Sequence, residues 1–271
     1  MSIIYAISDI HGFYNEMKKS LNLVDLDSDK DNKLIFLGDY IDGGPKSCQV
    51  LYHIKMLEET YPDQVVCLIG NHDQMFIDWY QGKDLHQWLS HDLQMITTKS
   101  FFSENEFSRI FKEALLLKLS YEKIVTYFKK AFIKKHPQLL KWLSEKNNNL
   151  YYENNKQIFV HAGICETDET LWKYSTASEE FTWKFPAETG YFYKDIIAGH
   201  VSSAEVALNH EFLGKVYWDK QSHYFIDGET KLSGNIPLLK YDTLSDTYSS
   251  FRFNNDRWKE YIINRGNNEL I

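Results

Sequence analysis

The sequence predicts a layered α/β protein, and two observations support this fold class. First, short apolar runs rich in β-branched residues recur along the chain, and each stops abruptly at polar residues. Runs of this kind are typical of strands buried on both faces inside an α/β layer. Second, the segments between the first three runs carry apolar residues at helical spacing, so strand and helix alternate. The five runs are Ile3–Ile7, Leu34–Leu37, Val65–Ile69, Ile158–Val160 and Ile196–Ala198.

Two helices are expected between these first three strands. Residues Phe13–Leu23 form the first, which ends before an acidic loop. The second begins near Pro45, because proline is tolerated in a first helical turn, and apolar residues recur at helical spacing from Val50 to Leu57.

The region 74–150 differs from the rest of the chain, being rich in Lys, Phe, Leu and Trp. Segments 107–119 and 121–133 place apolar residues three and four apart, as amphipathic helices do. We therefore expect a helical insertion between the third and fourth strands, which either caps the site or thickens the core.

The tail from Gly214 alternates polar and apolar residues at 215–218, 223–226 and 238–241, with turn signals at 227–228 and 233–234. This pattern predicts antiparallel strands. Since no linker or repeat interrupts the chain, residues 1–271 are expected to form one domain.

Composition narrows the class of protein. With 43% hydrophobic residues the 271-residue chain can build a large core, which excludes a disordered protein. Its net charge of -8 argues against a binder of nucleic acid duplexes or anionic membranes. Three widely spaced cysteines and an N-terminus without a basic stretch indicate neither a disulfide framework nor a signal peptide, so we expect a cytoplasmic protein.

Polar residues follow each apolar run, where open α/β sheets place their ligands. Carboxylates, imidazoles and an amide without a thiolate suit Mn²⁺, Fe or Zn²⁺, and their number fits two metals better than one. These residues are Asp9, His11, Asp39, Asp42, Asn71, His72, His161 and His200.

The spacing of these residues resembles the calcineurin-like metallophosphoesterases, in particular the phosphoprotein phosphatase branch with its bacterial protein phosphatases and symmetrical diadenosine tetraphosphatases. The resemblance implies a β-sandwich flanked by helices. The matching motifs are Asp9-x-His11-Gly12, Gly38-Asp39-x-x-Asp42, Gly70-Asn71-His72-Asp73, His161-Ala162-Gly163 and Gly199-His200.

By this resemblance the site holds two divalent metals, Mn²⁺ first, with Fe, Zn²⁺ or Mg²⁺ as alternatives. Asp9 and His11 bind the first metal and Asp39 bridges to the second. The remaining ligands of the second metal are Asn71, His161 and His200.

The resemblance also implies a mechanism, in which a metal-bridging hydroxide attacks phosphorus in line. His72 acts as general acid for the leaving alkoxide, and Asp42 holds its imidazole charged and correctly aimed. Because Asn71 and His72 are adjacent, an extended backbone would point them to opposite sides, one to metal and one to substrate.

The sequence departs from the family pattern at the phosphate-binding arginines. Gly43 stands where an Arg usually follows the second motif, and Lys184 after Trp183 stands in place of a further Arg. Lys is a point charge without the bidentate fork of Arg. The expected phosphate contacts are therefore Lys184 or Lys46, the amides beginning at Gly43, and Asn71.

Three functions are compatible with these features. The leading hypothesis is a phosphate-monoester hydrolase similar to serine/threonine protein phosphatases. The alternative is a hydrolase of dinucleoside polyphosphates or other nucleotides, suggested by Asp73 and the absent Arg. The third is a phosphate-binding module without turnover. The other histidines are assigned no role at the site, and Trp79, Trp88 and Trp142 are assigned to helix packing.

Overall fold

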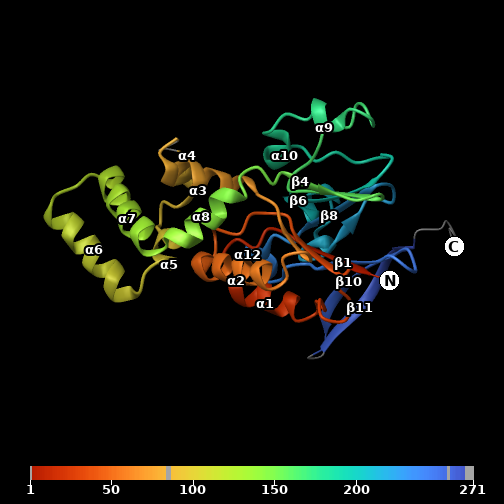
Figure 1. The fold of residues 1–271 in the computed structure, drawn as a ribbon, viewed down its shortest axis with the longest axis horizontal. Coiled ribbons are helices and arrows are strands. Elements are labelled where there is room, and N and C mark those ends of the chain that lie inside the picture. The colour runs from red at the N-terminus through yellow and green to blue at the C-terminus, as the bar shows by residue number, and fades with distance from the viewer. Residues whose placement is uncertain (1, 84–86, 255–256, 266–271) are drawn as a thin grey trace.

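The structure is a computed structural model that describes residues 2–83, 87–254 and 257–265. Its centre consists of two β-sheets with helices on their outer faces (Figure 1). One sheet has six strands in the order β11-β10-β9-β1-β2-β3, and the other has five in the order β4-β5-β6-β8-β7. This arrangement confirms the layered α/β sandwich predicted from the sequence.

The strands of the six-stranded sheet are β1 (Ile3–Ile7), β2 (Lys33–Phe36), β3 (Val65–Cys67), β9 (Leu239–Asp242), β10 (Thr247–Asn254) and β11 (Arg257–Arg265). The strands of the other sheet are β4 (Tyr151–Glu153), β5 (Gln157–Val160), β6 (Asp195–Ser202), β7 (Tyr217–Trp218) and β8 (His223–Asp227). Strands β1, β2 and β3 pair in parallel, and so do β5, β6 and β8. Each sheet therefore brings three carboxyl ends to one edge.

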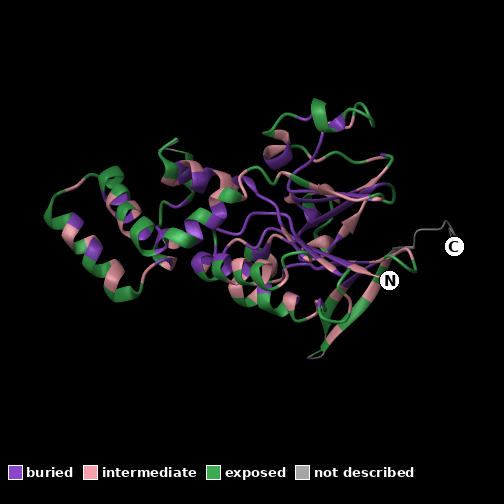
Figure 2. Ribbon diagram, in the orientation of Figure 1, coloured by how far each residue is buried: buried purple, intermediate pink, exposed green. Residues whose placement is uncertain are grey.

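The predicted buried strands acquire two apolar faces because successive side chains point to opposite sides of a sheet. On β1, Ile4 and Ala6 pack between the sheets against Phe159 and Ile197 of the other sheet. Ile7 points the other way, into the core beneath the helices. Figure 2 shows the resulting buried layer at the centre of the molecule.

Helices α1 (Tyr14–Leu21) and α2 (Ser47–Thr60) connect the first three strands. The second helix starts two residues after Pro45, so that proline precedes the helix and does not lie in its first turn. Shorter helical segments follow the insertion: α9 (Trp172–Ser175), α10 (Glu180–Trp183), α11 (Ser203–Val206), η1 (His210–Phe212) and α12 (Thr230–Ser233).

Between β3 and β4 the described chain is helical. The helices are α3 (Asn71–Gln81), α4 (Gln87–His91), α5 (Ile96–Ser100), α6 (Glu104–Leu116), α7 (Tyr121–Lys135) and α8 (Pro137–Glu145). Helices α6 and α7 extend away from the sheets (Figure 1) and share a small core of their own that includes Ile110 and Phe128. Residues Trp79, Trp88 and Trp142 join the main core, in agreement with their assignment to helix packing.

The strands β10 and β11 were not predicted. They are rich in Ser, Asn and Arg, and β10 is exposed over its last residues, so the alternation of polar and apolar side chains that identifies a strand is weak.

In the part of the chain that the structure describes, no helix is both long enough and apolar enough to span a bilayer.

Candidate active site

Residues from both sheets converge at the carboxyl ends of their strands. Nε2 of His11 lies 3.8 Å from Oδ1 of Asp9 and 3.5 Å from Oδ2 of Asp39. On the other side of Asp39, Nε2 of His161 lies 3.6 Å from the same Oδ2 and 3.0 Å from Oδ1 of Asn71. The carboxylate of Asp39 is therefore central to the cluster.

His200 joins the cluster from β6. Its backbone N–H donates to the carboxylate of Asp9 at 3.1 Å, and its ring centroid lies 5.2 Å from that of His161. The structure thus brings together all eight polar residues that the sequence placed at strand ends.

The backbone at this edge has an unusual conformation. Asp9, His11, Asp39, Asp42 and His200 have φ of 51°, 47°, 55°, 70° and 64°. Residues other than glycine rarely adopt left-handed conformations, and such strain of about 1–3 kcal/mol per residue is concentrated at functional sites. Four of these residues follow strands β1 and β2, whereas His200 lies within β6.

Asn71 and His72 are not on extended backbone, contrary to the sequence-based expectation. They begin helix α3, where Asp73 caps the helix by accepting from the backbone N–H of Gly70 at 3.2 Å. The backbone N–H of His72 donates to Oδ1 of Asp39 at 3.0 Å. The divergence of the two side chains therefore comes from the 100° step of a helix and not from a strand.

Asp73 has a structural position. It is fully buried, and its other oxygen accepts from the backbone N–H of Tyr40 at 3.0 Å. The two oxygens of Asp73 thus connect the segment after β2, at Tyr40, to the start of α3, at Gly70. Both oxygens of Asp73 are therefore engaged by backbone N–H groups.

Asp42 and His72 form a hydrogen-bonded pair, with Nδ1 of His72 2.9 Å from Oδ2 of Asp42. Asp42 is buried, whereas the side chain of His72 is 19% exposed. Burial alone would lower the pKa of His72, but the carboxylates of Asp39 and Asp42 outweigh burial and raise the pKa to about 9. The imidazole is therefore charged at neutral pH, and its Nε2 is free to face a substrate.

Burial would raise the pKa of Asp39, but the imidazoles of His161, His72, His11 and His200 outweigh it and lower the pKa to about 2. Burial lowers the pKa of His161 to about 3, so this ring is neutral and able to act as a ligand. The carboxylate of Asp39 is therefore charged, and the neutral imidazole of His161 beside it can act as a metal ligand.

Asp227 at the end of β8 adds a further carboxylate that the sequence analysis did not single out. Burial raises the pKa of Asp227 to about 6. The pKa of the fully buried Asp9 is raised by burial and by the charge of Asp227. Asp227 also follows an apolar run, at 223–226, but the sequence analysis assigned residues 227–228 to a turn.

Two overlapping groups of side chains could hold cations among the described residues. Ligand atoms of Asp39, His161 and His200 lie within 4.8 Å of one another, and so do those of Asp39, His11 and His72. In the second group, His72 already gives its Nδ1 to Asp42. Nε2 of His72 therefore remains available to a cation or to a substrate.

The surrounding structure fits divalent metals. A Cβ on Gly199 would lie 2.2 Å from Oδ2 of Asp9, and one on Gly70 would lie 2.1 Å from Oδ1 of Asp39. Both glycines let the backbone approach the carboxylates closely. The donors are oxygen and nitrogen atoms without a thiolate, as Mn²⁺, Fe and Zn²⁺ prefer.

The residues predicted to contact phosphate lie at different places. Lys184 packs over Gly163, two residues from His161, and its ammonium donates to the carbonyl of Ile164 and pairs with Glu188. Lys46 is half-buried, and its ammonium donates to Oδ1 of Asn15 at 3.0 Å. Gly43 has a φ of 85°, and a Cβ there would lie 3.7 Å from Cβ of His11, so this position borders the cluster.

The insertion contributes contacts that the sequence did not reveal. The ring centroid of His91 lies 4.8 Å from that of His72. Trp88 and Thr97 donate hydrogen bonds to Asp42. Lone His, Trp and Thr residues on helices carry no signal by spacing, so only the fold could place them here.

Comparison with known proteins identifies the class. Residues 3–209 match the family model of the calcineurin-like phosphoesterases, which is more than half of the chain. The chain therefore belongs to the calcineurin-like phosphoesterase family, as the motifs predicted.

Individual relatives match over shorter stretches. A symmetrical bis(5'-nucleosyl)-tetraphosphatase of Nitrosospira multiformis is 41% identical over 70 residues, 26% of this chain and 24% of the relative. A Caenorhabditis elegans protein provisionally named a serine/threonine-protein phosphatase is 39% identical over 79 residues, 29% of this chain and 21% of the relative. These matches span about a quarter of the relatives' length.

Solved structures share the fold over nearly the whole chain. A cold-active protein-tyrosine phosphatase of a psychrophilic Shewanella superposes with a TM-score of 0.55 at 17% identity, covering 95% of this chain and 80% of the other. A serine/threonine phosphatase of Saccharomyces cerevisiae gives 0.51 at 12% identity, covering 100% and 82%. At this identity the likeness shows the fold alone.

Proposed function

We propose that the protein is a binuclear metal-dependent phosphoesterase that hydrolyses phosphate monoesters, with phosphorylated serine or threonine in proteins as its leading substrate. The observation that carries the proposal is the position of the Asp39 carboxylate, whose Oδ2 lies 3.5 Å from Nε2 of His11 and 3.6 Å from Nε2 of His161, so that it stands between two groups of ligand atoms. A carboxylate between two such groups suits a pair of cations, and pairs of this kind serve phosphate-ester hydrolysis.

In this proposal Asp9, His11 and Asp39 hold one metal, and Asp39, Asn71, His161 and His200 hold the other. Mn²⁺ is the first candidate, with Fe, Zn²⁺ or Mg²⁺ as alternatives. When bound, the two cations supply an acidic water as nucleophile and neutralise negative charge on the phosphoryl group.

The chain's own residues then handle the proton and the substrate. His72 donates its Nε2 proton to the leaving alkoxide as the P–O bond breaks, and Asp42 stabilises the imidazolium and fixes its tautomer. Lys184 and the amides at Gly43 are proposed to bind the phosphoryl oxygens together with Asn71. Lys46 is a second candidate, and its ammonium donates to Oδ1 of Asn15.

A second candidate substrate class is a dinucleoside polyphosphate or another nucleotide. The similarity to symmetrical bis(5'-nucleosyl)-tetraphosphatases over 70 residues supports this class. We further propose a cytoplasmic location, because all three cysteines are free thiols, which agrees with a reducing compartment.

The test is turnover of a phosphopeptide, diadenosine tetraphosphate and p-nitrophenyl phosphate by the Mn²⁺-loaded protein. His72→Asn removes the proposed acid, and His210→Asn is the matched control at an exposed histidine of η1. We expect wild type and His210→Asn to hydrolyse the phosphopeptide alike and His72→Asn to be slower by about 10²-fold or more.

Each other outcome has a definite reading. A clear preference for diadenosine tetraphosphate overturns the assignment of the leading substrate while keeping the class of enzyme. A wild-type protein no faster than His72→Asn on any of the three substrates overturns the enzyme and leaves a phosphate-binding module.

A further inference from the structure

We propose that the helical insertion takes part in catalysis through two positioning residues, Trp88 on α4 and Thr97 just inside α5, which fix the carboxylate of Asp42. The inference rests on the proposed function, in which His72 is the general acid. It assigns to the insertion a role in the chemistry and not only in covering the site.

The first observation is the set of donors on Asp42. Oγ1 of Thr97 donates to Oδ1 at 2.7 Å, and Nε1 of Trp88 lies 3.2 Å from Oδ2 and 3.3 Å from Oδ1. The third donor is Nδ1 of His72, 2.9 Å from Oδ2. Two of the three donors thus come from the insertion and not from the strand ends that carry the motifs.

The second observation is burial. Asp42, Trp88 and Thr97 are 3%, 1% and 1% exposed. Water therefore has little room to replace a donor that is removed, and an unpaired oxygen of a buried carboxylate is costly. The carboxylate keeps one orientation only while all three donors are present.

The third observation is that Thr97 is itself fixed by its neighbours. The backbone N–H groups of Thr97 and Thr98 each donate to the buried carboxylate of Asp92 at 2.9 Å, and the hydroxyl of Thr98 donates to it as well. Met95, immediately before α5, has a φ of 55°, so the chain turns sharply into this short helix. The two backbone donors thus orient α5 so that the Thr97 hydroxyl meets Asp42, and both remain when the Thr98 hydroxyl is removed.

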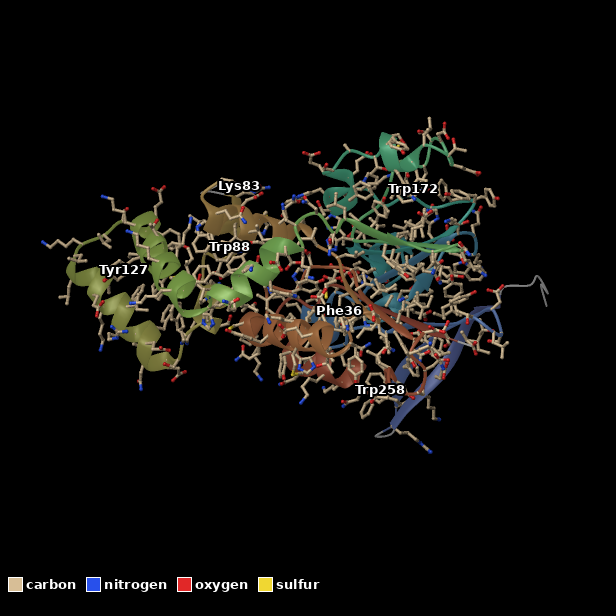
Figure 3. All side chains as sticks on the ribbon, viewed as in Figure 1. Phe36, Lys83, Trp88, Tyr127, Trp172 and Trp258 are labelled. Atoms are coloured by element: carbon tan, nitrogen blue, oxygen red, sulfur yellow. The ribbon has the colours of Figure 1, made fainter. Side chains whose placement is uncertain are left out.

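Trp88 is fixed in a different way, by aromatic packing. Its ring centroid lies 4.4 Å from that of Trp79 and 4.9 Å from that of Phe76, both on α3. Helix α3 also carries His72, so acid and donor share one support. Figure 3 shows Trp88 near the junction of the insertion with the sheets.

These contacts have a consequence for the proton transfer. A carboxylate has several acceptor sites, and one that is free to rotate could accept from His72 in more than one geometry. With Oδ1 held by Thr97 and both oxygens contacted by Nε1 of Trp88, Oδ2 stays aimed at Nδ1 of His72. The Nε2 proton is then presented in one direction, toward the leaving group.

The experiment compares Thr97→Val with Thr98→Val. Both changes remove one buried hydroxyl from adjacent positions of α5, but only Thr97 contacts Asp42. Thr97→Ser keeps the hydroxyl and is the rescue variant, and Trp88→Phe removes the second donor. Each metal-loaded protein is assayed on phenyl phosphate, whose leaving group needs a proton, and on p-nitrophenyl phosphate, whose leaving group needs one much less.

We expect Thr97→Val to lower kcat on phenyl phosphate about tenfold, the loss of one hydrogen bond to a charged group, with a smaller loss on p-nitrophenyl phosphate. KM, metal content and melting temperature should match those of Thr98→Val. Thr97→Ser should restore the rate, and Trp88→Phe should show the same dependence on the leaving group.

Equal losses on both substrates, or the same behaviour of Thr97→Val and Thr98→Val, overturn the positioning role while leaving the proposed function intact. A wild-type protein inactive on both substrates overturns the proposed function itself, and the inference with it.

Discussion

Nδ1 of His72 lies 2.9 Å from Oδ2 of Asp42, although one residue begins helix α3 and the other follows strand β2. The pair lies beside the proposed metal ligands without belonging to them. This separation predicts that proton donation can be impaired while metal binding is preserved.

Replacement of Asp42 by Asn tests that separation. The amide keeps the size of the side chain but removes the charge that favours imidazolium, so kcat should fall about 10²-fold or more. Metal content by mass spectrometry should remain that of wild type. A variant that loses its metals together with its activity would contradict the separate roles.

Lys184 is predicted to bind the phosphoryl group. Lys184→Gln should raise KM for p-nitrophenyl phosphate about tenfold, since a charged contact to phosphate is lost, with a smaller effect on kcat. The matched control is Lys55→Gln, because Lys55 and Glu59 form an i,i+4 pair as Lys184 and Glu188 do, but on the outer helix α2. Equal KM values for the two variants would remove Lys184 from the site.

The contacts of His223 predict that the free energy of unfolding depends on pH through a group outside the active site. Its ring is buried between Asp219 and Glu166, each at 3.1 Å, and Nδ1 also lies 3.0 Å from the carbonyl of Gly190. Burial would lower the pKa of His223, but the hydrogen bonds to the two carboxylates outweigh it and raise the pKa to about 9.

Because this pKa is higher in the folded than in the unfolded protein, charged His223 stabilises the fold. This stabilisation is fully present below about pH 6.5 and is lost as the pH rises through about 9. Its size is about 3 kcal/mol. Urea unfolding between pH 6 and 10 should show a larger loss in wild type than in His223→Gln, because His72, whose pKa is also raised to about 9, contributes equally in both proteins. His136→Gln is the control, because His136 faces the hydroxyl of Tyr52 and the carbonyl of Phe101. A wild-type stability that stays flat over this range would refute the role of His223.

The sequence predicted the parts of the fold that depend on local pattern. The boundaries of β1 were predicted without error, because its apolar run is continuous and ends at Asp9. The eight strand-end residues were predicted because each follows such a run. Their convergence within each sheet follows from the rule that parallel strands end at one edge, whereas the meeting of the two edges depends on how the sheets pack.

The remaining features depend on contacts between distant segments. Trp88 and Thr97 reach Asp42 from 46 and 55 residues away, and no periodicity signals such a contact. The left-handed backbone of Asp9 and Asp39 is a property of the assembled edge. The helical position of His72 was not predicted, because the apolar run 65–69 indicated only a strand. Gly70, which ends that run, is also the N-cap residue of α3.

The central claim, that Asp39 joins two metal sites, is tested most directly by the metal stoichiometry of Asp39→Asn. Its carboxylate lies 3.5 Å from His11 and 3.6 Å from His161, so both sites should lose their shared ligand at once. Equilibrium dialysis against Mn²⁺ followed by mass spectrometry should find two ions per chain in wild type and in the Asn15→Ala control, and fewer than one in Asp39→Asn. Two fully occupied ions in Asp39→Asn would contradict the account.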